Sequence, residues 1–171
     1  MSKDLAKRIV DALAHDLSEL KFDERHDDVS DRIAGVIKKP WNGWRRVFGG
    51  HGIAAVAVVP ESVGDCTALK AFFSMVRREI NERYVGFAAY KSSYSFVVLV
   101  CAHHLFEACP GIPSRLKDRT GLHTNIIQGV ILVDAETGAV TTDYTRPAQH
   151  KDEYDAVLSA TQSGAKQENR D

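Results

Sequence analysis

The chain has 171 residues, a length that favours one domain able to bury a stable core without a disulfide or a metal. Its 22 basic and 23 acidic residues leave a formal net charge of −1, which excludes a bulk field that would attract nucleic acid or anionic lipid. The three cysteines are odd in number and irregularly spaced, so we expect reduced thiols in a cytoplasmic protein.

Two helices are predicted at the amino-terminal end of the chain. Residues 3–21 carry apolar side chains at helical spacing, and Ser2 can cap their start. Residues 28–39 show a similar but less regular spacing and end in two lysines before Pro40, as expected for the end of a helix. The amino-terminal part is therefore expected to cover the core with two helices.

The middle of the chain predicts the core of the fold. Residues 53–59 and 94–102 are apolar almost without alternation, which is typical of strands that are covered on both faces. Between them, residues 66–83 place apolar side chains three and four apart, so we predict an amphipathic helix. Residues 85–90 follow as a further strand, which a tight turn would join antiparallel to 94–102. We expect the two apolar strands to lie at the centre of the sheet.

The remaining third begins with a long segment of no clear period, residues 103–123, which holds two prolines and two glycines. A loop of this length in a compact domain is often functional. After it we predict a hairpin of two strands, at 124–133 and 139–145. A short helix at 151–160 and a disordered polar tail at 161–171 follow. Gly138 is placed to take the left-handed conformation in the hairpin. We therefore expect one α+β domain over residues 1–160, with a mixed, mostly antiparallel sheet of about five to six strands.

A first candidate site combines Cys66, His123 and Asp134. Cys66 stands at the start of the central helix, where the exposed amides and the helix dipole stabilise a thiolate. A cysteine at a helix start, followed by a histidine and a carboxylate on later strands, resembles the order in papain-like and transglutaminase-like enzymes. However, Asp65 opposes thiolate formation, and Asp134 also suits the turn before Gly138. A cysteine-dependent hydrolase or transferase is therefore the alternative hypothesis.

A second candidate site consists of Cys101, His103 and Cys109. Sulfur and imidazole ligands at close spacing are typical of zinc sites, and Cys101 and His103 would share one face of a strand. Cys109 would have to fold back across the following loop, and the sequence contains no CxxC pair. We favour a buried thiol at the end of a core strand beside solvent-exposed histidines, and we expect no metal or other cofactor.

A third candidate is the segment of residues 38–46, which combines four cations with two tryptophans. The four side chains best suited to binding are Trp41, Trp44, Arg45 and Arg46. Such side chains stack on bases and hold phosphates, or they anchor a protein partner. Five acids between residues 23 and 31 weaken the local positive field. We favour tryptophans that anchor the first helices to the sheet, and we keep a nucleic-acid accessory role as a second alternative.

The leading hypothesis is a small module that acts by binding a protein partner or a second copy of itself. The sequence contains no phosphate-binding loop or dinucleotide fingerprint, so we lean against an enzyme. Strands that are apolar throughout need cover on both faces, and few helices are predicted, which favours a homodimer. The longest apolar runs span about seven residues, too few for a membrane-spanning helix, so no membrane partner is expected.

Overall fold

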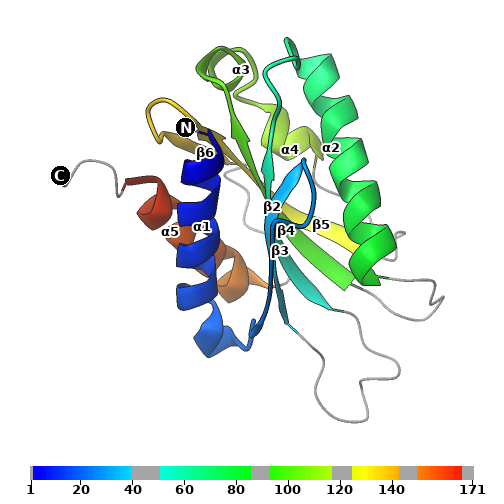
Figure 1. Cartoon of the computed structure of the whole chain (residues 1–171), viewed down its shortest axis with the longest axis vertical. Helices are drawn as coiled ribbons and strands as arrows, with labels where there is room; N and C mark the ends of the chain where they lie inside the picture. The colour runs from blue at the N-terminus through cyan, green and yellow to red at the C-terminus, as the bar shows by residue number, and fades with distance from the viewer. Residues whose placement is uncertain (1, 40–50, 86–92, 117–124, 143–149, 167–171) are drawn as a thin grey trace.

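The computed structural model describes residues 2–39, 51–85, 93–116, 125–142 and 150–166. Six strands form one mixed sheet in the order β1-β2-β3-β4-β5-β6, and helices cover both of its faces (Figure 1). The strands are β1 (Glu24–Asp27), β2 (Ile33–Lys39), β3 (Gly52–Val58), β4 (Ser93–Cys101), β5 (Asn125–Asp134) and β6 (Val140–Thr142). The α-helices are α1 (Ser2–Asp16), α2 (Cys66–Ile80), α3 (His103–Ala108), α4 (Ile112–Leu116) and α5 (Lys151–Lys166). The predicted α+β class is confirmed.

The sheet combines an antiparallel part with a parallel part. β2 pairs antiparallel with both β1 and β3. β4 pairs parallel with both β3 and β5, and β6 pairs antiparallel with β5. Because β3 and β5 lie on the two sides of β4, the predicted antiparallel pairing of 94–102 with 85–90 is wrong. Val85 instead ends a π-helical turn, η3 (Asn81–Val85), that continues α2. Residues 86–90 lie outside the described ranges.

Two apolar layers, one on each face of the sheet, form the core. On one face, α2 packs with α3 and α4, and on the other face α1 packs with α5 (Figure 1). Val56 and Val98 are fully buried, which confirms the central position of the two apolar strands. The chain's own helices therefore cover both faces of the sheet. The need for cover by a second copy, which was the reason to expect a homodimer, is removed. The homodimer itself stays a prediction. No helix in the described ranges is long and apolar enough to cross a membrane.

The prediction of a second helix over residues 28–39 is wrong, because this segment forms a turn followed by β2. Val36 and Ile37 are β-branched, and strands favour such side chains more than helices do. β2 also pairs on both sides, with β1 and with β3. Gly35 allows α1 to pack closely on this strand, since a Cβ at that position would lie 2.7 Å from a methyl carbon of Val10.

The carboxy-terminal helix is longer than predicted. The sequence suggested a tail from residue 161, but α5 continues to Lys166 and packs along α1. Gly164 permits this packing, because a Cβ there would lie 2.9 Å from the Cα of Ile9. The hairpin between β5 and β6 is confirmed: Gly138 has a φ of 69°, and its amide donates to the Asp134 carbonyl at 3.0 Å.

Candidate functional site

The structure does not present Cys66 as a nucleophile. Cys66 begins α2 as predicted, and the Asp65 side chain caps the helix by accepting two amide hydrogen bonds of 2.8 Å. The Cys66 sulfur forms a disulfide with Cys109, the residue after α3. A disulfide sulfur has no thiolate to attack a substrate, so Cys66 cannot act as predicted while this bond is intact. The expectation of reduced thiols is wrong for this pair, and the cytoplasmic location that it suggested is untested.

His103 is the described imidazole that contacts Asp134, while His123 lies outside the described ranges. The Nδ1 atom of His103 donates to the Asp134 carboxylate at 2.7 Å. This carboxylate is 1% exposed and also accepts hydrogen bonds from the Glu136 amide at 2.9 Å and the Thr137 hydroxyl at 2.6 Å. The His103 side chain is 45% exposed. A buried carboxylate therefore fixes the orientation of an imidazole that reaches solvent.

The sheet explains why these two residues meet. Asp134 is the last residue of β5 and pairs with Cys101, the last residue of the parallel strand β4. His103 follows β4 by two residues. Side chains at the carboxyl ends of parallel strands gather at one edge, where open α/β sheets commonly bind their ligands. The ends of the predicted strands 94–102 and 124–133 could have indicated this pair, but only if these strands were known to be parallel neighbours.

The electrostatics of this pair favour the charged form of both partners. The hydrogen bond to Asp134 raises the pKa of His103 above its ordinary value, and the charges of Glu107 and Glu136 act in the same direction. Burial by itself raises the pKa of Asp134, but hydrogen bonds from Thr137, Glu136 and His103 outweigh burial and lower that pKa. Such a pair can hold or transfer a proton at the exposed ring of His103.

Replacing Asp134 with asparagine should lower the pKa of His103. The wild-type imidazole should titrate above the ordinary value of about 6.5, because the protonated ring donates to a carboxylate. The asparagine carries no charge, so the ring should titrate close to an exposed histidine. NMR of the imidazole carbon-bound protons against pH measures this change. An unaltered titration of His103 in Asp134→Asn would contradict the assigned contact.

The candidate metal ligands are not brought together. Cys109 is bonded to Cys66, so it has no thiolate to offer. Cys101 is 1% exposed, and burial, followed by the nearby charge of Asp134, raises the pKa of its thiol to about 12. Nδ1 of His103 is occupied by Asp134. Within the described ranges, no group of three or more His, Cys, Asp or Glu side chains is arranged to hold a metal ion.

A cluster of ionic and aromatic residues that sequence reasoning missed surrounds Glu153 near the amino-terminal ends of the parallel strands. The carboxylate of Glu153 is bonded by Lys39 Nζ at 2.7 Å and by His150 Nδ1 at 2.8 Å. The ring of Tyr94 stacks on His150 with 3.5 Å between centroids. Burial by itself raises the pKa of Glu153, but hydrogen bonds from Lys39 and Tyr94 outweigh burial and lower it. The cluster ties β2 and β4 to α5, and no local sequence pattern indicates that these segments meet.

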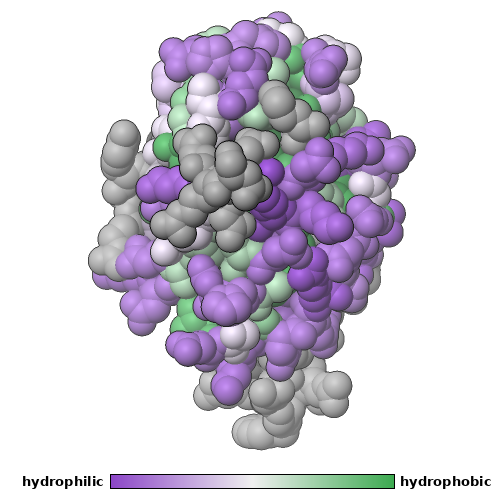
Figure 2. Space-filling view, turned by 60° about the vertical axis from the view of Figure 1, so that its left-hand side comes forward, coloured by the Kyte–Doolittle hydropathy of each residue, from purple (hydrophilic) through white to green (hydrophobic). Residues whose placement is uncertain are grey.

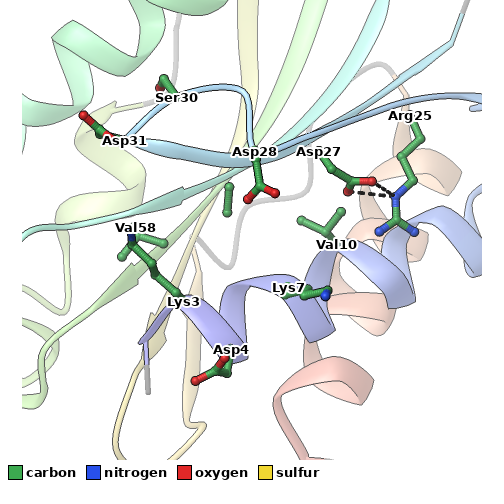
Figure 3. Close-up of a pocket in the computed structure, with 11 residues that line it drawn as sticks. Lys3, Asp4, Lys7, Val10, Arg25, Asp27, Asp28, Ser30, Asp31 and Val58 are labelled. Atoms are coloured by element: carbon green, nitrogen blue, oxygen red, sulfur yellow. Dashed lines mark hydrogen bonds and ion pairs between the residues drawn. The ribbon is translucent and has the colours of Figure 1, made fainter.

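A hollow of about 350 Å³ lies between α1 and the turn that joins β1 to β2, and we call it the α1 hollow. Its lining consists of Lys3, Asp4, Lys7, Val10, Arg25, Asp27, Asp28, Ser30, Asp31, Ala34 and Val58. Figure 3 shows the Asp28 carboxylate pointing from the turn toward α1, while Asp27 is held by Arg25. Asp28 has a φ of 46°, an uncommon conformation for a residue other than glycine. The hollow therefore has an acidic wall opposite the lysines of α1.

The predicted binding side chains Trp41, Trp44, Arg45 and Arg46 lie outside the described ranges, so their role stays a prediction. The nucleic-acid alternative, which depends on the same segment, is equally untested. Comparison with protein-family models, with curated proteins and with solved structures found no match, so the function has to be inferred from the geometry of this chain alone.

Proposed function

We propose that the protein is a binding module that recognises a mixed-charge segment of a protein partner in the α1 hollow. The observation that carries this proposal is the arrangement of charge across the hollow. One wall presents Lys3 and Lys7 from the first two turns of α1, and the other presents Asp28 and Asp31 from the β1–β2 turn. Among the described residues, none of these four side chains forms an ion pair with another. Their charges are available to a ligand that carries both signs.

The character of the lining favours a segment of a macromolecule over a small-molecule ligand. Small-molecule pockets are mostly apolar and aromatic with a few polar groups, whereas seven of the eleven side chains that line this hollow are charged. Val10 and Val58 supply an apolar floor that can contact the stems of long side chains. Exposed charges of this kind give orientation and association rate more than high affinity. We therefore expect moderate affinity that falls as salt is added.

Two other modes of partner binding are less well supported by the described surface. Met75 is the one large hydrophobic residue in the described ranges that is strongly exposed. On the face shown in Figure 2, hydrophilic residues cover most of the surface and hydrophobic residues occupy small areas. Strand addition would require a long open edge, whereas β1 has four residues, most of them exposed and charged. Recognition by side-chain charge is the mode that fits these observations.

Titration with short synthetic peptides tests the proposal. A peptide of alternating lysine and glutamate should shift the NMR amide signals of residues 2–10 and 25–34 in a saturable way. Peptides of lysine alone or glutamate alone should shift them less, because each meets repulsion from one wall. The double variant Lys3→Glu/Lys7→Glu should bind the mixed peptide about fivefold or more weakly. Acidic side chains in the first turns of a helix interact favourably with the helix dipole and stabilise the helix, so this variant should stay folded.

Lys70→Glu is the matched control, because Lys70 is exposed on α2, on the opposite face of the sheet. This variant should bind the mixed peptide as well as the wild type does. Signal changes spread over the whole surface, or equal binding by the Lys3/Lys7 variant and the wild type, would overturn the assignment of the α1 hollow.

A further inference from the structure

We propose that the Cys66–Cys109 disulfide is an exchangeable redox site, with Cys66 as the sulfur that an incoming thiolate attacks. The bond joins the first residue of α2 to the residue that follows α3, across a sequence separation of 43. The start of α2 and the whole of α3 lie at the same end of the sheet, and both helices pack in the same apolar cluster (Figure 1). This site is independent of the α1 hollow, which uses α1 and the β1–β2 turn.

The two cysteines differ in their exposure to solvent. Cys66 is partly exposed on the rim of the apolar cluster, whereas Cys109 is 3% exposed and packs within the same cluster as Leu105 and Ile112. Thiol–disulfide exchange requires an approach to the attacked sulfur from outside, along the line of the bond. An external thiolate can therefore reach Cys66, and Cys109 is the leaving sulfur.

The position of Cys66 also suits the reduced state. The amino end of a helix of 15 residues stabilises a thiolate in its first turn, which keeps the released Cys66 reactive. The Asp65 charge acts against this effect, so a moderate stabilisation is expected. Cys109 is surrounded by apolar side chains and would hold its proton. The pair thus combines an accessible reactive sulfur with a buried resolving sulfur.

The exchange with a dithiol reductant proceeds in two balanced steps. A thiolate of the reductant attacks the Cys66 sulfur, a mixed disulfide forms, and the Cys66–Cys109 bond breaks with its electron pair on Cys109, which takes up a proton. The second thiolate of the reductant then attacks the reductant's own sulfur in the mixed disulfide. Cys66 leaves as a thiolate, and the reductant becomes a disulfide. Two electrons have passed from the dithiol to the protein.

Reduction removes the one covalent link in the described ranges between α2 and the α3–α4 segment. This segment, residues 103–116, is otherwise anchored by a few buried side chains, which are those of Leu105, Ile112, Pro113 and Leu116. His103 is its first residue, so the redox state would also affect how firmly the imidazole is held on Asp134. The site therefore couples thiol chemistry to the carboxyl edge of the sheet.

Differential alkylation of the folded wild-type protein tests the proposal. The oxidised protein is treated briefly with dithiothreitol at neutral pH and alkylated with iodoacetamide. It is then unfolded, fully reduced and alkylated with a second, heavier reagent, and the tags are mapped by mass spectrometry. We expect the first tag on Cys66 at a rate about tenfold or more above that on Cys109. Cys101 is buried and is the internal control, which should carry the second tag alone.

Two single variants provide an independent measurement with oxidised glutathione. Cys109→Ser should form a mixed disulfide at Cys66 while folded, and Cys66→Ser should not form one at Cys109. Circular dichroism checks that each variant is folded. Reduction of the wild type only after unfolding, first tagging of Cys109, or three titratable thiols in protein purified under oxidising conditions would each overturn the proposal.

Discussion

Replacing Cys66 and Cys109 together with alanine should lower the free energy of unfolding by about 4 kcal/mol. The disulfide closes a loop across a sequence separation of 43, and a loop of that size restricts the unfolded chain by about this amount in the chain-entropy model. For a protein of this size, the melting temperature should fall by about 8–16 °C. The effect should be large because the bond constrains a quarter of the chain before folding begins.

Urea unfolding followed by circular dichroism measures this difference. The variant should show a lower midpoint and a steeper dependence on urea, because its unfolded chain lacks the cross-link and exposes more surface. Cys101→Ala is the matched control, since it removes a buried thiol without removing a cross-link. A loss below about 1 kcal/mol in the double variant, or an equal loss in the control, would show that the disulfide contributes little.

Replacing Glu153 with glutamine should cost about 2–3 kcal/mol at neutral pH, because charge-assisted hydrogen bonds to a largely buried carboxylate are lost. Lys39 and His150 both bond this carboxylate, and Tyr94 shares the cluster. Glutamine keeps the shape of the side chain but removes its charge. Lys39 would then lack a charged partner at the edge of the core. Partial exposure of Lys39, 33% of its side chain, keeps the expected cost below that of a fully buried pair.

The same substitution should change the response to acid in a definite direction. The pKa of Glu153 is lowered in the folded state, so its contribution is complete above the unfolded value of about 4.3 and is lost as the pH falls through the folded value. The difference in stability between wild type and Glu153→Gln should therefore shrink below about pH 4. Urea unfolding at several pH values measures it. Asp152→Asn is the exposed control, and a gap that persists undiminished in acid would contradict the ionic assignment.

The strongest local patterns predicted their elements correctly. Strands at 53–59 and 94–102 followed from unbroken apolar runs, and the helix from residue 66 followed from its apolar stripe. Gly138 was placed correctly in the hairpin because a tight turn requires a left-handed residue there. These features depend on the side chains of one short segment, which is why sequence reasoning was sufficient.

The weaker patterns were decided by partners elsewhere in the chain. The spacing in residues 28–39 suits a helix, but β1 and β3 offer backbone hydrogen bonds on both sides, and a strand results. Residues 161–166 are largely polar, yet α5 continues through them because Gly164 packs against α1 and Ala165 is buried in the apolar cluster on that face. In both segments, tertiary packing outweighs a modest local preference.

By itself, the sequence determined the α+β class, the two central strands and the helix between them, since each of these follows from periodicity and burial within one segment. Only the tertiary structure decided the order of the strands, the bond between Cys66 and Cys109, and the choice of His103 as the imidazole on Asp134. The long-range contacts described above span 31 residues for His103 and Asp134, 43 for the disulfide and 114 for Lys39 and Glu153. Partners at such separations are selected by which faces and strand ends pack together, and local periodicity carries no information about that choice.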